Sequence, residues 1–166
     1  ETIIISTGAS ARMLGLKEED ELMGYGISTC ATCDGYFFKD KNITVVGGGD
    51  SAMEEASFLT KFAKKVTIIH RSEMFRASKI MLDRVKNNPL IEILVNKSIK
   101  SINGTQKDGV SSIVLTDTVS GQESTFDCEG VFYGIGHNPN TDLFKGIIDL
   151  DDNGYILTKP DSTLTN

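Results

Sequence analysis

The sequence predicts an α/β fold in which a central parallel sheet with helices carries an inserted antiparallel β-meander. Two observations support this fold class. Residues 43–69 contain a buried strand, a glycine turn, a helix and a second strand rich in β-branched residues, which together make one complete βαβ unit. From residue 91 onward the chain changes to short apolar runs separated by turn residues, a pattern typical of antiparallel strands.

The elements of the sheet follow from local patterns along the chain. Strands are expected over residues 2–6, 43–46 and 66–69, and helices over residues 51–63 and 79–86. In the first helix, alanine and leucine recur at intervals of three and four, which gives a narrow face of small side chains suited to close packing on a sheet. The second helix is stopped by two asparagines and a proline.

The second half of the chain is predicted to contain the meander and a short tail. The runs IEILVN, KSIKSING, VSSIVLTDT and STFDCEG are expected to form the inserted antiparallel strands. The run GVFYGIG then returns to the parallel sheet as a further strand. The tail from residue 149 is predicted to form a hairpin without another helix.

Length and charge exclude several classes of protein. The chain has 166 residues, 39% of them hydrophobic, which is enough for one good core and part of a second. A formal net charge of -6 leaves no broad basic surface for nucleic acid or an anionic membrane. No apolar run approaches the ~20 residues needed to span a bilayer. Because the chain begins at Glu1 without a methionine, a basic segment or an apolar signal, we expect it to be a piece of a larger protein.

The glycine turn after residue 46 carries the first candidate site. Gly47, Gly49 and Ala52 fit the pattern G-x-G-x-x-A at a strand-to-helix junction, which is typical of a Rossmann-like dinucleotide-binding domain. The first glycine makes the tight turn, the second lets a pyrophosphate approach the backbone, and the alanine keeps helix and strand close. Asp50 and Ser51, which stand between them, are also candidate cofactor-binding residues. The alternative is a tight turn before a buried helix, without a ligand.

The end of the next strand bears on which nucleotide binds. NAD sites usually place an acidic residue about 20 positions after the glycines, whereas here the strand ends in His70 and Arg71. Arg71 and Arg76 flank a turn, and a guanidinium suits a 2′-phosphate because it can form two parallel charge-assisted hydrogen bonds. NADPH is therefore favoured over NADH. The alternatives are that both arginines are solvated surface charges, or that Glu73 binds the ribose as in an NAD site.

Two cysteines at C-x-x-C spacing form the second candidate site. Cys30 and Cys33 can close a small disulfide ring and reopen it by thiolate attack, and this spacing near a βαβ unit is typical of a cytoplasmic redox motif. A zinc site would need further paired ligands, which the scattered remaining cysteine and histidines do not offer, so no metal is expected. Asp34 is placed to exchange protons with a thiolate, or else forms a turn or cap. Cys128 is predicted to be buried or half-buried, without a redox role.

Four sequence motifs resemble those of the bacterial and plant low-molecular-weight thioredoxin reductases. They are, in order, CATCDG, VVGGGDSAMEEA, IHRSEMFRASKIM and GIGHNPNT, and they span nearly the whole chain. The resemblance implies that NADPH passes a hydride to FAD, that the flavin reduces a Cys30–Cys33 disulfide, and that the resulting dithiol reduces thioredoxin. It also implies a cytoplasmic parent protein that forms a homodimer.

The resemblance further assigns roles to the candidate residues. Cys33 would face the flavin, Cys30 would attack the partner disulfide, and Asp34 would be the acid. The remaining positions would contact the cofactors: Gly47, Gly49, Asp50, Ser51 and Ala52 at the pyrophosphate, His70, Arg71, Ser72 and Arg76 at the 2′-phosphate, Gly136 and His137 beside the nicotinamide, and Thr7 and Gly8 in the flavin-side turn. Ser72 stands where many members have a second arginine, so the preference for NADPH is expected to be weaker.

The same resemblance divides the chain into domains. Residues 12–139 would form the NADPH-binding domain with the redox C-x-x-C, while residues 1–11 and 140–166 would be remnants of an FAD domain joined to it by a hinge. The family's FAD-binding glycine motif is absent from the sequence, so the isolated piece is expected to be inactive without its FAD domain. Two rival interpretations are the flavoprotein subunit of a peroxide-reducing system and a non-enzymatic dinucleotide-binding module. In the second, the cysteines would form a static disulfide or hold a metal.

Overall fold

The computed structural model describes residues 2–166 and divides them into two compact units. Unit 1 contains residues 2–12 and 136–166, and unit 2 contains residues 13–135. The two terminal segments therefore fold together as one unit. Glu1, the first residue of the predicted segment 1–11, lies outside the described residues. Within residues 2–166, no helix has the length and apolar character that crossing a membrane requires.

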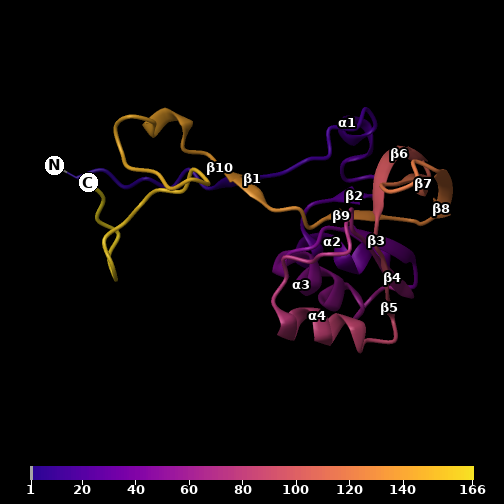
Figure 1. The fold of residues 1–166 in the computed structure, drawn as a ribbon. Helices are drawn as coiled ribbons and strands as arrows, with labels where there is room; N and C mark the ends of the chain where they lie inside the picture. The colour runs from indigo at the N-terminus through magenta and orange to yellow at the C-terminus, as the bar shows by residue number, and fades with distance from the viewer. Residues whose placement is uncertain (1) are drawn as a thin grey trace. The chain divides into compact units, whose positions relative to one another are not determined.

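Unit 2 contains most of the secondary structure (Figure 1). In chain order its elements are α1 (Glu19–Leu22), β2 (Ile27–Ser28), α2 (Ala31–Asp34), the 3-10 helix η1 (Gly35–Phe38), β3 (Asn42–Val46), α3 (Asp50–Leu59), β4 (Lys65–Ile69), α4 (Lys79–Lys86), β5 (Ile91–Leu94), β6 (Lys97–Thr105), β7 (Gly109–Asp117), β8 (Glu123–Asp127) and β9 (Val131–Tyr133). Helix α4 and strands β3 and β4 agree with the sequence prediction to within one residue at each end.

The central sheet of unit 2 is parallel throughout. Its strands lie in the order β2-β9-β3-β4-β5, and β3 pairs with β4 from Asn42↔Lys65 to Val46↔Ile69. Strand β9 pairs with both β2 and β3, so the chain returns to the interior of the sheet after the antiparallel meander β6-β7-β8. The predicted α/β fold, with a parallel sheet and an inserted antiparallel meander, is confirmed.

Each face of the parallel sheet packs against a different layer. Along β3, Val45 belongs to the core beneath the helices, whereas Val46 belongs to the core beneath the meander. The first core includes Ala56 of α3, and the second includes Ile113 of β7. Figure 1 shows helices α2, α3 and α4 on one side of the sheet and strands β6 to β8 on the other. Burial on both faces explains why these strands read as continuous apolar runs.

Unit 1 is organised around a short two-stranded pairing. Strand β1 (Ala9–Ala11) pairs antiparallel with β10 (His137–Pro139), and the 3-10 helix η2 (Asp142–Phe144) follows. The predicted tail hairpin is reduced to a single bridge between Leu150 and Ile156. Several large apolar side chains of this unit are exposed, among them Ile3, Ile4, Leu143 and Ile147.

Two strand predictions are wrong. Residues 2–6 form no strand in the structure, and the first strand begins at Ala9 because β10 offers hydrogen-bonding partners only from there. The run IEILVN, predicted as part of the meander, supplies β5, which pairs parallel with β4. Helix α4 crosses over the sheet between β4 and β5, and such a crossover returns the chain parallel to the preceding strand.

Helix α3 ends earlier than predicted. It stops at Leu59 rather than at residue 63, and the Thr60 hydroxyl donates a hydrogen bond to the Ser57 carbonyl oxygen (2.7 Å) at this end. Ala63 lies outside the helix but is still buried in the core beneath the helices. Packing against this core therefore explains the apolar residue at position 63, although the helical backbone ends before it.

Glu55 on α3 is a partly buried carboxyl group without a full set of partners. Its Oε2 atom is buried and makes no hydrogen bond with any described residue. Burial raises the pKa of Glu55 from its ordinary 4.5 to about 7. The unfolded chain releases this proton near pH 4.5, whereas the folded chain keeps it until about pH 7. The free energy of unfolding therefore falls as the pH rises from about 4.5 to about 7.

We expect Glu55→Gln to stabilise the protein in a pH-dependent way. At pH 8 the free energy of unfolding should rise by about 1 to 2 kcal/mol, allowing for partial exposure of the group, and the gain should shrink to less than half at pH 5. Urea unfolding at the two pH values measures this. Glu54→Gln, at an exposed position on the same helix, is the matched control and should change little at either pH. Equal gains at pH 5 and pH 8 would contradict the assignment.

Candidate functional site

The two cysteines of the C-x-x-C motif lie at the carboxyl end of β2. That strand ends at Ser28, and the short helix α2 begins at Ala31 with Cys30 as its N-cap residue. Cys30 and Cys33 are joined by a disulfide in this structure. The Sγ atom of Cys30 accepts a hydrogen bond from the Cys33 N–H (3.2 Å). An amide donor in this position would stabilise a thiolate on Cys30 if the disulfide were reduced.

The two sulfur positions differ in exposure. Cys33 is exposed within unit 2, whereas Cys30 is half-buried. The roles assigned to them by resemblance, Cys33 towards the flavin and Cys30 towards the partner, stay predictions. The amide contact described above favours Cys30 as the nucleophile, because a stabilised thiolate is the reactive form of a cysteine.

A buried hydroxyl connects the predicted acid to the cysteine backbone. Ser28 is only 3% exposed. Its Oγ atom donates a hydrogen bond to Asp34 Oδ2 (2.6 Å) and accepts one from the Cys30 N–H (3.0 Å). The structure thus brings Asp34 together with the cysteine motif through a serine that sequence reasoning missed. A possible signal was the position of this serine two residues before the first cysteine, where hydroxyls often accept a backbone N–H.

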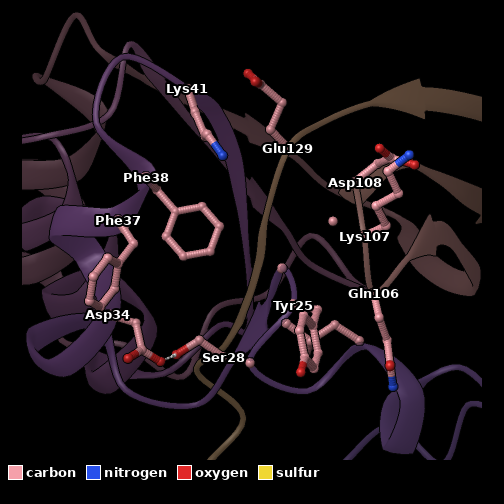
Figure 2. A pocket seen from close by; sticks show the side chains of 14 residues that line it. Tyr25, Ser28, Asp34, Phe37, Phe38, Lys41, Gln106, Lys107, Asp108 and Glu129 are labelled. Carbon is pink, nitrogen blue, oxygen red and sulfur yellow. Dashed lines mark hydrogen bonds between the residues drawn. The ribbon is translucent and has the colours of Figure 1, made fainter.

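A hollow of about 360 Å³ opens beside Asp34. Figure 2 shows Asp34, hydrogen-bonded to Ser28, and Phe37 on one side, with residues 106–108 of the β6–β7 turn on the other. Tyr36 and Phe37, which lie three and four positions after Cys33, are 67% and 73% exposed. Charged side chains of both signs line the hollow: Lys41, Lys107, Asp108 and Glu129. No sequence pattern indicated this hollow, because it joins segments that are distant along the chain.

The glycine turn between β3 and α3 is tightly packed on one side and open on the other. A Cβ atom at Gly47 would collide with the Gly134 carbonyl oxygen and lie 2.7 Å from Ala52 Cβ, so only glycine fits there. Ala52 is fully buried, as predicted from its spacing. By contrast, nothing lies within 4 Å of the position that a Cβ would take on Gly49. This open side, next to the free N–H groups at the start of a helix, fits an anionic pyrophosphate.

The first turn of α3 starts directly after Gly49. Asp50 and Ser51 are both exposed there, and Asp50 Oδ1 accepts a hydrogen bond from the Ser78 N–H (2.7 Å). Because β2, β9 and β3 run parallel, the glycine turn and the disulfide follow the carboxyl ends of strands and lie at the same edge of the sheet. Ligands of open α/β sheets bind at this edge.

The loop of residues 71–78 folds over the glycine turn. The Gly48 carbonyl oxygen accepts hydrogen bonds from the N–H groups of Arg76 (2.8 Å) and Ala77 (3.0 Å). The ring of His70 fills the space in which a side chain at Gly48 would lie. The loop and the glycine turn therefore form one packed structure, although sequence reasoning treated them as two separate motifs.

His70 and Ser72 shape this loop from within. His70 Nε2 lies 3.0 Å from the Met74 carbonyl oxygen, and its ring centroid lies 4.6 Å from that of Phe75. The Ser72 hydroxyl donates to the same Met74 oxygen (3.1 Å). Both side chains make contacts inside the loop, so their predicted contact with a 2′-phosphate stays a prediction.

Arg71 and Arg76 present two exposed positive charges on the loop. All four ion pairs found within residues 2–166 are formed by lysines, so neither guanidinium is paired with a carboxylate there. Glu73, the alternative ribose ligand, accepts a hydrogen bond from Asn96 Nδ2 (3.0 Å) just before the meander. The two arginines can therefore bind an added anion without first breaking an ion pair.

The remaining predicted cofactor residues lie in unit 1. The carbonyl oxygens of Thr7 and Gly8 accept hydrogen bonds from Asn140, through its side-chain Nδ2 and its backbone N–H respectively (3.0 Å each). Gly136 has a φ of +96°, and His137 opens β10. These four predicted residues share the β1–β10 region of unit 1, whereas the other predicted site residues belong to unit 2.

Cys128 is buried, at 2% exposure, as predicted. Burial raises the pKa of its thiol to about 11, so the thiol stays protonated and unreactive near neutral pH. Within residues 2–166, no group of three or more His, Cys, Asp or Glu side chains is arranged to hold a metal ion.

Comparison with known proteins identifies relatives over the whole chain. Residues 1–165 match the family model described as pyridine nucleotide-disulphide oxidoreductase. The chain is 53% identical over 164 residues to a thioredoxin reductase from Mycolicibacterium smegmatis, covering 99% of this chain and 52% of that protein. It is 50% identical over 166 residues to a thioredoxin reductase from Streptomyces clavuligerus, covering 100% of this chain and 51% of that protein. The chain spans about half the length of the curated relatives it matches.

Solved structures of similar proteins agree with the fold. The crystal structure of thioredoxin reductase from Streptococcus pyogenes MGAS5005 matches with a TM-score of 0.84 at 41% identity, covering 95% of this chain and 51% of that one. Thioredoxin reductase from Giardia duodenalis matches with a TM-score of 0.84 at 39% identity, covering 95% and 52%. The predicted resemblance to thioredoxin reductases is confirmed, and the chain belongs to the pyridine nucleotide-disulphide oxidoreductase family.

Proposed function

We propose that this chain supplies the pyridine-nucleotide site and the redox dithiol of an NADPH-dependent thioredoxin-disulfide reductase. The observation that carries the proposal is the Cys30–Cys33 disulfide at the same sheet edge as an open glycine turn. The similar proteins are themselves named thioredoxin reductases, which supports the same reaction here. In this reaction electrons enter from the nucleotide and leave through the two sulfur atoms.

The nucleotide would be held by two groups of residues in unit 2. Its pyrophosphate would lie on the open side of Gly49, where the free amides of α3 attract an anion. Its 2′-phosphate would be bound by Arg71 and Arg76, whose exposed guanidinium groups form no ion pair within residues 2–166. When bound, NADPH and FAD would supply the electrons, and the residues of this chain would orient them.

The dithiol would transfer electrons by thiol–disulfide exchange. Reduction of the Cys30–Cys33 disulfide takes two electrons and two protons and gives two thiols. The Cys30 thiolate, favoured by the Cys33 N–H, would attack one sulfur of the partner disulfide and release the other sulfur as a thiolate. Asp34, held by Ser28, would protonate that leaving thiolate. Cys33 would then attack Cys30 in the mixed disulfide, which releases the partner as a dithiol and restores the disulfide.

Thioredoxin would approach from the side of the hollow beside Asp34. Exposed aromatic side chains near a reactive site are typical of contact surfaces, and Tyr36 and Phe37 lie three and four positions after Cys33. The hollow continues this surface to the turn between β6 and β7. We therefore infer that Phe37 contributes to partner docking.

Most of unit 1 would belong to an FAD domain of a longer protein. Residues 1–11 and 140–166 would be parts of that domain, with Thr7 and Gly8 on the flavin side and Gly136 and His137 near the nicotinamide. The exposed apolar side chains of this unit support a place against further chain. The longer protein would be a cytoplasmic homodimer.

A trapping experiment tests the role of the two cysteines. Thioredoxin carrying thionitrobenzoate on its attacking cysteine should react with the reduced Cys33→Ser chain and release the coloured thiol as a covalent complex forms. The Cys30→Ser chain should react about tenfold or more slowly, because its remaining thiol lacks the amide contact. Buried Cys128 should add little background. Faster reaction of the Cys30→Ser chain would reverse the assignment, and no reaction with either would remove thioredoxin as the partner.

A second variant tests the docking surface. Phe37→Ala, introduced into the Cys33→Ser chain, should slow complex formation with the activated thioredoxin by about tenfold, since an exposed aromatic anchor is lost. The same variant should react at an unchanged rate with free dithionitrobenzoate, which needs no docking surface. Stopped-flow absorbance of the released thiol measures both rates. Equal slowing with both reagents would assign the effect to the cysteines rather than to docking.

The phosphate assignment is tested by Arg76→Ala. Loss of charge-assisted hydrogen bonds should weaken NADPH binding by about 10- to 100-fold, while NADH binding changes less than threefold. Isothermal titration of the chain with each nucleotide measures the two dissociation constants. Arg84→Ala, at an exposed position on α4, is the matched control for loss of a surface charge. Equal weakening of NADPH and NADH by Arg76→Ala would exclude a 2′-phosphate contact.

A further inference from the structure

The C-terminal half of the 71–78 loop donates hydrogen bonds from three consecutive backbone amides to the glycine turn and the start of α3. The N–H groups of Arg76 and Ala77 donate to the Gly48 carbonyl oxygen (2.8 and 3.0 Å). The next amide, that of Ser78, donates to Asp50 Oδ1 (2.7 Å). Asp50 is therefore the side chain through which the start of α3 holds the segment that carries Arg76.

The N-terminal half of the same loop is held by different elements. The Thr118 hydroxyl donates to the Arg71 carbonyl oxygen (2.9 Å), and the Asn96 side chain donates to Glu73 (3.0 Å). These contacts come from the meander side of unit 2 and reach neither Arg76 nor its neighbours. The neighbours of Arg76, Phe75 and Ala77, also pack against the core beneath the helices. The hydrogen bonds that hold the backbone of this segment come from the glycine turn and from Asp50.

A direct contact between Asp50 and a dinucleotide is electrostatically unfavourable. Asp50 stands immediately after Gly49, beside the open side that fits a pyrophosphate, and like charges at such distances repel. A carboxylate is nevertheless tolerated at the first turn of a helix, where the helix dipole favours negative charge. The hydrogen bond from the Ser78 N–H gives this carboxylate a structural role that needs no contact with the ligand.

We propose that Asp50 is a positioning residue that favours NADPH over NADH by holding the Arg76 segment against the glycine turn. This inference rests on the proposed nucleotide site. If the segment were loose, Arg76 would have to be ordered each time a 2′-phosphate bound, and that entropic cost would weaken NADPH binding. NADH has no 2′-phosphate, so its binding would not depend on the order of this segment. Asp50 would thus act on the ratio of the two affinities.

Two substitutions at Asp50 separate the hydrogen bond from the charge. Asp50→Asn keeps an oxygen that can accept from Ser78, whereas Asp50→Ala removes it. In isothermal titrations of the 166-residue chain, Asp50→Ala should lower the ratio Kd(NADH)/Kd(NADPH) by about fivefold to twentyfold, in line with the loss of a side-chain to backbone hydrogen bond. Asp50→Asn should keep that ratio within about twofold of the original while binding both nucleotides at least as tightly, because a negative charge beside the pyrophosphate is gone.

Removing the donor of this hydrogen bond, the Ser78 N–H, provides an independent test. Ser78 has φ of -59° and ψ of 148°, and its side chain makes no capping hydrogen bond, so a proline fits the backbone angles of this position and Ser78→Pro removes the N–H. It should lower the ratio as Asp50→Ala does, and the double variant should be no worse than either single one. Amide hydrogen exchange should accelerate at Arg76 and Ala77 in Asp50→Ala and return to the original rate in Asp50→Asn.

The outcomes separate this inference from the nucleotide site itself. Equal weakening of NADPH and NADH by Asp50→Ala would mean that Asp50 contacts the part shared by both, which overturns the positioning role. A ratio unchanged in Asp50→Ala but lowered in Arg76→Ala would also overturn it, and would leave the proposed function intact. A ratio unchanged in both variants would remove the 2′-phosphate site and the inference together.

Discussion

The close approach of three backbone segments at the carboxyl edge of the sheet fixes the geometry of unit 2. A side chain at Gly47 would collide with the Gly134 carbonyl oxygen, and a Cβ atom at Gly134 would lie 2.8 Å from Ala52 Cα. The ends of β3 and β9 and the start of α3 therefore meet with no room for another atom. This contact places the first turn of α3 at the edge of the sheet. Because Gly48 has no side chain, the ring of His70 and the 71–78 loop can pack against it.

The same packing explains how an acidic chain can bind an anion. The chain carries a net charge of -6, so its overall field does not attract phosphate. Attraction must come from groups placed within a few ångströms of the ligand, namely the free amides of α3 and the guanidiniums of Arg71 and Arg76. These groups are useful only if they are held together. The hydrogen bonds between the loop and the glycine turn, rather than the number of positive charges, are therefore the feature on which the proposed site depends.

Local sequence patterns predicted the elements whose bounds depend only on neighbouring residues. Helix α4 spans Lys79–Lys86 as expected, because its stop signal is immediate, and the glycine turn follows β3 as its spacing required. Strand β5 was misassigned because an apolar β-branched run reads alike in parallel and antiparallel sheets, and only the crossover through α4 decides between them. Ser28 and the hollow beside Asp34 escaped prediction for a related reason. The importance of Ser28 lies in a bond to Asp34 six positions away, and the hollow needs the β6–β7 turn from a distant part of the chain.

The strand order also separates the two ends of the proposed reaction. Strand β9 lies between β2 and β3, so the elements that follow β2 and β3 leave the sheet two strand spacings apart, or about 10 Å. The cysteines follow β2, and the glycine turn proposed to bind phosphate follows β3. Each site consequently has its own supporting contacts: Ser28 for the cysteine motif, and Gly48 with Asp50 for the loop. Recognition of the proposed electron donor and reactivity towards the proposed acceptor could therefore vary independently on one sheet, since neither site uses the side chains that hold the other.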